Sequence, residues 1–297
     1  MIELQALSCV ADVSRYQGRI NGERIALIFE DRETTYSQLD QRASQIANGL
    51  VSELCHPGTR IGYLGKNSDR YFEVLSGAVK ANTVIAGVNW RLAAPELEYI
   101  LNNAETEILF VGAEFYEVIE QLHLSLHSVR KIIAIDGGHA EWPAFVDWRD
   151  AQDDTDPMLP IGMDEDVVQM YTSGTTGHPK GVQLTNGNYI DLLDQAANGG
   201  WGDWQTGEAV IVAMPIFHVS GTNVGVLGLA QGLKNIIVKD IDPLFILDLL
   251  EQHRVRYAFF VPAVILFLNS VPGVQNRDFS NLELILYGAS PISQDVL

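Results

Sequence analysis

Short apolar runs alternate with stretches of helical periodicity along most of the chain. The runs are four or five residues long and predict buried strands at 25–29, 61–64, 84–88, 108–111, 132–135, 209–213, 236–239, 257–261 and 284–287. A short return strand is expected at 34–36. Between the strands, apolar residues recur at helical spacing, as in Phe72, Leu75 and Val79. Strands that alternate with helices predict an α/β fold in which mostly parallel sheets are covered by helices.

Several helix ends can be predicted from capping residues. Ser37 and Asp40 resemble a capping box for the helix after the second strand. Pro95 suits the first turn of another helix. Thr185 suits an N-cap position, and a last helix is expected to begin at Ser290.

The segment 171–181, Tyr-Thr-Ser-Gly-Thr-Thr-Gly-His-Pro-Lys-Gly, combines glycines, small hydroxyl side chains and a lysine. Gly174, Gly177 and Gly181 permit backbone angles with positive φ and close approach of another molecule. Successive backbone N–H groups in such a loop can form an anion-binding concavity. The hydroxyl groups add donors, and Lys180 adds a mobile positive charge. The segment therefore predicts a polyphosphate-binding loop.

The flanks of this loop distinguish it from a Walker loop. Apolar runs at 167–171 and 182–184 predict that the loop joins two strands, whereas a Walker loop leads directly into a helix. The spacing also differs, because Gly177 stands three residues before Lys180. A surface turn rich in glycine and threonine is the simpler alternative, but turn chemistry alone does not require so many donors and a closing lysine.

Residues 171–181 resemble the signature loop of the adenylate-forming superfamily, which includes acyl-CoA synthetases, aryl-CoA ligases, luciferases and the adenylation domains of peptide synthetases. Two further segments stand in the expected order, Pro-Ile-Phe-His at 215–218 and Tyr-Gly-Ala-Ser-Pro at 287–291. The resemblance is closest to fatty-acyl-CoA synthetases. It implies the family's large N-terminal domain, with one α/β subdomain at about 55–185 and a second at about 186–297 together with 20–54. The family's β-barrel part and small C-terminal domain, with its catalytic lysine, have no counterpart in this sequence, so we expect the chain as given to be catalytically incomplete.

The resemblance also implies a two-step reaction and its participants. A carboxylate attacks the α-phosphate of ATP with Mg²⁺ bound, giving acyl-AMP and pyrophosphate, and the thiol of coenzyme A then displaces AMP. The implied catalytic residues are Lys180 and His218, and Thr172 is also the implied contact to Mg²⁺. The implied nucleotide-binding residues are Thr172, Ser173, Gly174, Thr175, Thr176, Gly177, Lys180, Gly288, Ala289 and Ser290.

Three histidines and one serine have simpler interpretations. A lone histidine near apolar neighbours, such as His218, is more often structural than functional. Ser290 also suits the N-cap of a strand-to-helix turn. His123 and His127 would share a helical face, but no third metal ligand is evident, so a solvated or half-buried face is favoured over a metal site.

Composition narrows the classes of partner. The chain has 297 residues, with 19 basic and 38 acidic side chains and a net charge of −19, which argues against nucleic acid. Many of the acidic residues crowd into 147–166, which predicts a solvated connector. Two cysteines are too few for a disulfide framework and favour a reducing cytoplasm. No signal peptide or transmembrane run is evident, so a cytoplasmic protein is expected.

Two other classes of function remain open. The chain could be a non-catalytic nucleotide-binding or interaction module. It could also belong to another ATP-using enzyme, such as a kinase, an aryl-CoA ligase or a peptide-synthetase adenylation domain. The sequence does not decide the chain length of the acid, the nature of the thiol or whether the protein forms a homodimer.

Overall fold

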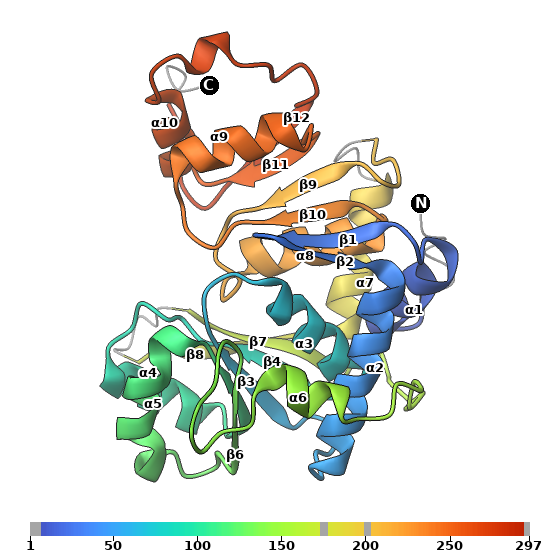
Figure 1. Ribbon diagram of the computed structural model, residues 1–297, viewed down its shortest axis with the longest axis vertical. Helices are drawn as coiled ribbons and strands as arrows, with labels where there is room; N and C mark the ends of the chain where they lie inside the picture. Colours follow the sequence, from blue (N-terminus) through green and yellow to red (C-terminus); the bar gives the residue numbers. More distant parts are fainter. Residues whose placement is uncertain (1–6, 173–177, 199–202, 294–297) are drawn as a thin grey trace.

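The chain forms two sheets with helices between them (Figure 1). The structure is a computed structural model that describes residues 7–172, 178–198 and 203–293. The first, called here the β3 sheet, has the strand order β6-β5-β3-β4-β7-β8. Its strands are β3 (Arg60–Leu64), β4 (Val84–Gly87), β5 (Thr106–Val111), β6 (Lys131–Ala134), β7 (Asp166–Thr172) and β8 (Lys180–Thr185). Neighbouring strands run parallel, apart from the antiparallel pair β7 and β8.

The second sheet, called here the β9 sheet, has the order β12-β11-β9-β10-β1-β2. Its strands are β1 (Ile25–Phe29), β2 (Arg32–Thr35), β9 (Ala209–Val212), β10 (Lys234–Ile237), β11 (Tyr257–Phe260) and β12 (Leu284–Tyr287). Its neighbours are also parallel, with the exception of β1 and β2. The prediction of two mostly parallel sheets is confirmed. The subdomain boundaries stay a prediction.

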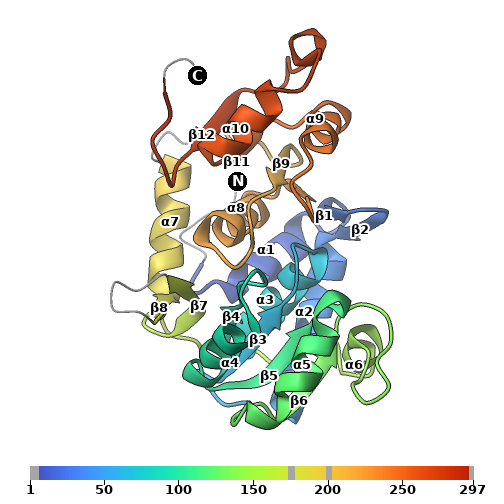
Figure 2. The ribbon, with the colours of Figure 1, turned by 90° about the vertical axis from the view of Figure 1, so that its left-hand side faces the viewer.

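Helices cover the faces of both sheets (Figures 1 and 2). They are α1 (Ala11–Ile20), α2 (Tyr36–Ser52), α3 (Asp69–Lys80), α4 (Ala94–Asn103), α5 (Tyr116–Leu122), α6 (Phe145–Asp150), α7 (Asn186–Asn198), α8 (Val219–Ala230), α9 (Pro243–Gln252) and α10 (Pro262–Asn269). The largest buried cluster joins the two sheets, since it contains Leu27 of β1, Ile61 of β3, Phe72 of α3 and Val226 of α8. This shared core fixes the carboxyl ends of the two sheets relative to each other.

Three local features differ from the predictions. The capping box of α2 is formed by Thr35 and Gln38, whose side chains each accept a hydrogen bond from the other's backbone N–H, and not by Ser37 and Asp40. Residues 288–293 are not helical, so no helix begins at Ser290 in the described part of the chain. The helices α1, α6 and α10 were not predicted.

The acidic connector is not simply solvated. Asp156 accepts hydrogen bonds from Arg15 at 2.9 and 3.0 Å. Lys80, whose side chain is fully buried, lies 2.8 Å from the same carboxylate. Asn48 of α2 donates to the backbone carbonyls of Asp153 and Thr155. The connector is therefore held against α1, α2 and α3.

Candidate functional site

A cavity of about 660 Å³ opens at the carboxyl end of the β9 sheet and is called here the β9 cavity. It is bounded by segments that follow the strands, with Met214 and Pro215 after β9, Ile241 after β10, Val261 after β11 and Ala289 after β12. Apolar side chains of the flanking elements supply most of the wall, among them Leu192, Val224, Leu227, Phe259, Val264 and Leu286. An apolar cavity of this size with few polar groups, at the carboxyl ends of parallel strands, is the usual form of a small-molecule site.

His218 lies at the rim of the β9 cavity, where α8 begins. Its backbone carbonyl accepts hydrogen bonds from the N–H groups of Gly221 and Thr222, and its own N–H donates to Pro215. Although the residue is accessible, the surrounding atoms desolvate the imidazole and lower its pKa, and the positive charge of Arg91 lowers the pKa further. The ring is therefore neutral at pH 7 and suited to hydrogen bonding.

One of the implied nucleotide-binding residues that follow β12 reaches the same cavity. Ala289 lines it, directly after β12 and its neighbour Gly288. Ala289 has a φ of 70°, in the left-handed region that costs a non-glycine residue about 1–2 kcal/mol. A Cβ added at Gly288 would meet Phe259 only at an ordinary 3.5 Å, so packing does not require a glycine there. Ser290 is exposed and lies beyond the residues that line the cavity.

The hairpin of β7 and β8 carries the predicted phosphate loop. Thr172 ends β7, Lys180 begins β8, and the two residues pair in the antiparallel register. Both are exposed. The expected strand–loop–strand arrangement is thus confirmed, while Ser173, Gly174, Thr175, Thr176 and Gly177 lie outside the described residues.

One contact ties this hairpin to the β9 cavity. Gly87 of β4 pairs with Met170 of β7, two residues before Thr172. A Cβ on Gly87 would lie 3.1 Å from the Cα of Phe217, the residue before His218. Strand spacing of roughly 5 Å and a rise of about 3.3 Å per residue place Thr172, at the end of β7, about 8 Å from Gly87. The hairpin and the segment that carries His218 are therefore linked through β4.

Gly181 packs closely against two side chains of β7. A Cβ at this position would lie 2.6 Å from Nε2 of Gln169 and 3.3 Å from the ring of Tyr171. Gln169 also accepts a hydrogen bond from Arg60 at 3.0 Å and donates to Tyr171, which in turn donates to Asn103. These bonds fix the base of the hairpin.

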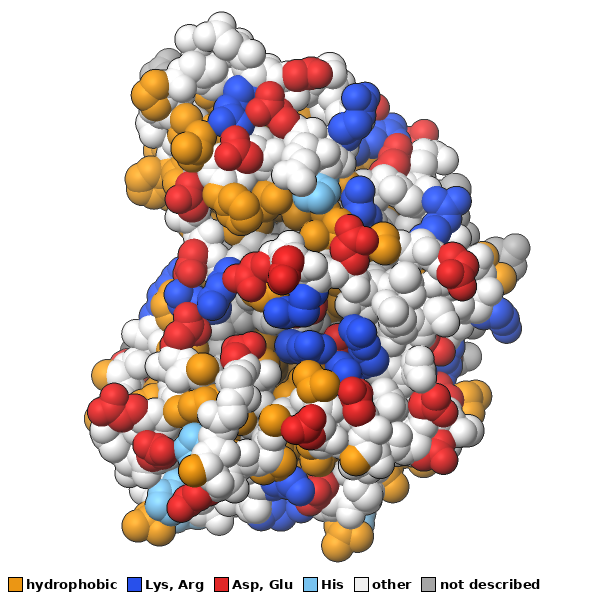
Figure 3. Space-filling view, in the orientation of Figure 1, with side chains coloured by type: hydrophobic (Ala, Val, Ile, Leu, Met, Phe, Trp, Pro, Cys, Tyr) orange, Lys and Arg blue, Asp and Glu red, His pale blue; other side chains and the backbone are white. Residues whose placement is uncertain are grey.

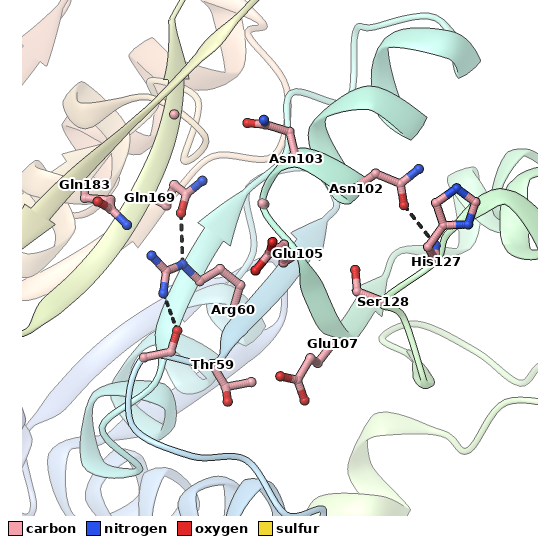
Figure 4. Close-up of a pocket in the computed structure, with 13 residues that line it drawn as sticks. Thr59, Arg60, Asn102, Asn103, Glu105, Glu107, His127, Ser128, Gln169 and Gln183 are labelled. Carbon is pink, nitrogen blue, oxygen red and sulfur yellow. Dashed lines mark hydrogen bonds between the residues drawn. The ribbon is translucent and has the colours of Figure 1, made fainter.

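A second cleft, of about 710 Å³, lies at the opposite end of the β3 sheet (Figure 4). Its lining is polar, and Arg60 at the start of β3 stands near its centre, bonded to Gln169 and to the carbonyl of Gly58. Glu105 and Glu107 enter from β5 and the turn before it. Since open α/β sheets bind ligands at the carboxyl ends of their strands, we assign the candidate site to the β9 cavity.

Comparison with known proteins decides the family. Residues 15–297 match the family described as AMP-binding enzyme. The chain belongs to the AMP-binding enzyme family. It is 35% identical over 275 residues to a fatty acid–acyl-carrier-protein ligase of Streptomyces coeruleorubidus, covering 92% of this chain and 51% of that protein. A feruloyl-CoA synthase of an Amycolatopsis species is 32% identical over 267 residues, covering 88% of this chain and 50% of that protein.

Solved structures agree with this assignment. The N-terminal domain of FACL13 from Mycobacterium tuberculosis superposes with a TM-score of 0.87 at 25% identity, over 98% of this chain and 72% of that one. An anthranilate CoA ligase has the same fold, with a TM-score of 0.90 at 22% identity, over 99% of this chain and 58% of that one. The chain spans about half the length of the curated relatives it matches.

Arg91 is the site residue that sequence patterns missed in this AMP-binding chain. It lines the β9 cavity, and its guanidinium lies 4.8 Å from the ring centre of Trp90 and 5.7 Å from that of Phe217. The available signal was its place, four residues after a strand at a carboxyl edge. Only the fold brings it beside His218.

The expectation that His123 and His127 share a helical face is wrong. Helix α5 ends at Leu122, His123 lies in a short 3-10 turn, and the backbone is extended at Leu126, so His123 and His127 do not share a helical face. Over residues 7–172, 178–198 and 203–293, the structure holds no group of three or more potential metal ligands. In the same ranges we find no helix with the length and apolar character that crossing a bilayer requires.

Proposed function

We propose that this chain is the nucleotide- and acid-binding part of an ATP-dependent, AMP-forming acid–thiol ligase. The carboxylate of the acid attacks the α-phosphate of ATP, pyrophosphate leaves, and a thiol then displaces AMP from the acyl-adenylate. The observation that carries the proposal is the apolar β9 cavity, which His218 and Arg91 also line. The residue before His218 packs against β4, and β4 pairs with β7, the strand that leads into the predicted phosphate loop.

The described residues support particular roles in this reaction. Lys180 supplies positive charge and Thr172 a hydroxyl donor at the mouth of the loop, where a polyphosphate needs both. Arg91 favours a carboxylate at the rim, and neutral His218 orients it by hydrogen bonding rather than as a general base. Backbone at Gly288 and Ala289 gives adenine a flat surface.

Magnesium fits this site as part of the substrate. Mg²⁺ prefers oxygen ligands and keeps several waters, so it is usually bound through substrate phosphates and one or two protein oxygens. Within the described residues Thr172 offers one such oxygen. We propose that Mg²⁺ enters with ATP and is held mainly by the phosphates.

The apolar wall favours a fatty acid as the substrate. Coenzyme A is proposed as the thiol because a long-chain-fatty-acid–CoA ligase of Mycobacterium tuberculosis is among the relatives. An aromatic acid is the second candidate, because a feruloyl-CoA synthase is among the relatives. A carrier-protein thiol is the alternative to coenzyme A, because another relative is a fatty acid–acyl-carrier-protein ligase. Cytoplasmic location and a homodimer stay predictions.

The test is acid-dependent exchange of labelled pyrophosphate into ATP by the protein as its gene encodes it. A panel of fatty and aromatic acids would be screened, with acyl-AMP detected by mass spectrometry. Exchange that depends on the acid, together with the matching acyl-AMP, supports the proposal. Release of phosphate instead of pyrophosphate, or binding of ATP without exchange for any acid, contradicts it.

A further inference from the structure

The turn after β3 reaches across to the wall of the β9 cavity through Asn67. This side chain is buried, at 4% exposure. Its Nδ2 donates to the carbonyl of Met214 at 2.9 Å, and its Oδ1 accepts from the N–H of Ile216 at 3.0 Å. The carboxamide of Asn67, in the turn after β3, thus binds two backbone groups in the segment after strand β9.

The segment that Asn67 holds is not part of a strand and has no ladder of backbone hydrogen bonds. It lies between the end of β9 at Val212 and the start of α8 at Val219, so its backbone groups need partners from elsewhere. A buried backbone group left without a partner costs about 1–3 kcal/mol. Asn67 supplies both a donor and an acceptor, which ties the position of this segment to the β3 sheet.

The side chain of Thr222 also binds the backbone of Ile216. The hydroxyl of Thr222 donates to the carbonyl of Ile216 at 2.6 Å and shares a hydrogen bond of 2.7 Å with the hydroxyl of Tyr71. Both backbone polar groups of Ile216 are therefore bound by side chains. Tyr71 belongs to α3, so this contact also joins the two sheets.

Other contacts of the same turn join the sheets but do not touch the cavity wall. Arg32 donates to Asp69 at 2.6 and 2.9 Å, and Lys66 lies 2.9 Å from Asp240. Figure 3 shows mixed Lys/Arg and Asp/Glu side chains gathered at the waist where the two sheets meet. These charged contacts hold the sheets together, whereas Asn67 reaches the segment that carries Met214, Pro215 and His218.

We infer that Asn67 is a positioning residue that sets how tightly the β9 cavity holds its acid. Met214, Pro215 and His218 all line the cavity and flank the two atoms that Asn67 binds. Loss of the amide frees this wall to shift, and a displacement of about 1 Å is enough to lower the fit of a bound ligand. The inference rests on the proposed function for the identity of the acid.

Asn186 offers a matched control. It is 2% exposed and also bridges two distant backbone groups, accepting from Val10 at 2.8 Å and donating to Glu165 at 3.0 Å. It does not line the β9 cavity. Asn67→Ala and Asn186→Ala therefore remove the same kind of bridge, and only the first touches the cavity wall.

The experiment compares these two variants with the wild-type protein as its gene encodes it. The measurements are the KM for the preferred acid and for ATP in pyrophosphate exchange, the Kd of the fluorescent fatty acid cis-parinaric acid, and the Tm. We expect Asn67→Ala to raise the KM for the acid and the Kd about tenfold, with the KM for ATP changed less than twofold. Asn186→Ala should lower the Tm but leave all three constants within twofold.

Equal effects of the two variants on the acid constants, or no effect of Asn67→Ala, overturn the inference. If Asn67→Ala does not fold, the variants Thr222→Val and Thr222→Ser test whether the position of this wall controls acid binding, because Thr222 binds the other backbone group of Ile216. The valine variant should raise the Kd for cis-parinaric acid at least threefold, and the serine variant, which keeps the hydroxyl, should restore it. Equal values for these two variants also overturn the inference.

Failure of the proposed function gives a different result. A wild-type protein that binds cis-parinaric acid but exchanges no pyrophosphate would contradict the ligase activity, while the Kd values of the variants would still decide the role of Asn67. A wild-type protein that neither binds the probe nor exchanges pyrophosphate would contradict both.

Discussion

At the residue scale, the proposed chemistry depends on a few cations in a strongly acidic chain. Basic side chains number 19 against 38 acidic ones, and many are paired. Within the described part of the chain, neither Lys180 nor Arg91 has an ion-pair partner, and both lie where a negatively charged substrate is proposed to bind. A charge that is not already neutralised is the kind that can stabilise a phosphate or carboxylate.

Substitution of Lys180 tests its role in the phosphate loop. We expect Lys180→Ala to lower acid-dependent pyrophosphate exchange by about 10-fold or more, because one charged contact to the phosphates is lost. Initial rates at saturating ATP give the comparison. The control is Lys131→Ala. Lys131 is on β6 and pairs with Glu53, which follows α2. Unchanged exchange in Lys180→Ala would exclude the proposed role.

At the scale of elements, helices α1 and α10 were not predicted because their starts lack a capping side chain or a change of hydrophobic pattern. The N-cap position of α1 is Val10, whose side chain cannot cap, and its N–H is bound by Asn186 from 176 residues away. Helix α10 follows β11 in one apolar run, and periodicity cannot separate a buried strand from a buried helix. Pro262 is its first residue, as is common at a helix start.

The crossing of α2 and α3 depends on a glycine. A Cβ at Gly77 would lie 2.4 Å from Cγ2 of Ile46, so Gly77→Ala should destabilise the fold by about 1–3 kcal/mol through overpacking. Urea unfolding measures the change in free energy. Gly138→Ala is the control, since nothing lies within 4 Å of its Cβ position. Adding Ile46→Ala to Gly77→Ala should recover part of the loss, and strictly additive losses would refute the contact.

At the scale of the whole molecule, the acidic connector holds the N-terminal helices to the β3 sheet. Burial alone would raise the pKa of Asp156, but hydrogen bonds from Arg15 and Lys80 outweigh this effect and lower the pKa well below its ordinary value. A carboxylate whose pKa is lowered in the folded state stabilises the fold above its unfolded pKa of about 4. That contribution is lost as the pH falls toward the folded-state pKa.

Asp156→Asn should therefore destabilise the protein most at neutral pH. We expect a loss of about 1.5–3 kcal/mol at pH 7, the size of hydrogen bonds to a charged group, that shrinks progressively below pH 4 or so. Urea unfolding at a series of pH values measures it. Asp154→Asn removes the same charge from an exposed residue that accepts only from Gln41 among the described residues. A loss in Asp156→Asn that does not depend on pH would contradict the ion-pair account.

The sequence by itself determined the class of fold, the order of the strands along the chain and the hairpin that carries the predicted phosphate loop. These features are local, because short apolar runs, turn residues and a dense group of donors are each contained in a few consecutive positions. The match of Leu284–Tyr287 to the predicted last strand is one example. The same local patterns placed Ala289 just after a strand, whereas His218 follows β9 by six residues and stands at the N-cap position of α8.

Only the tertiary structure decided which of these strand ends meet. Arg91 and His218 are 127 positions apart, and no local pattern relates them; the shared core between the sheets places both on one cavity. Asn67 binds backbone atoms 147 and 149 positions away. The Thr35 cap likewise depended on side-chain geometry that the sequence pattern left open. Long-range contacts of this kind depend on packing, and packing is a property of the folded chain as a whole.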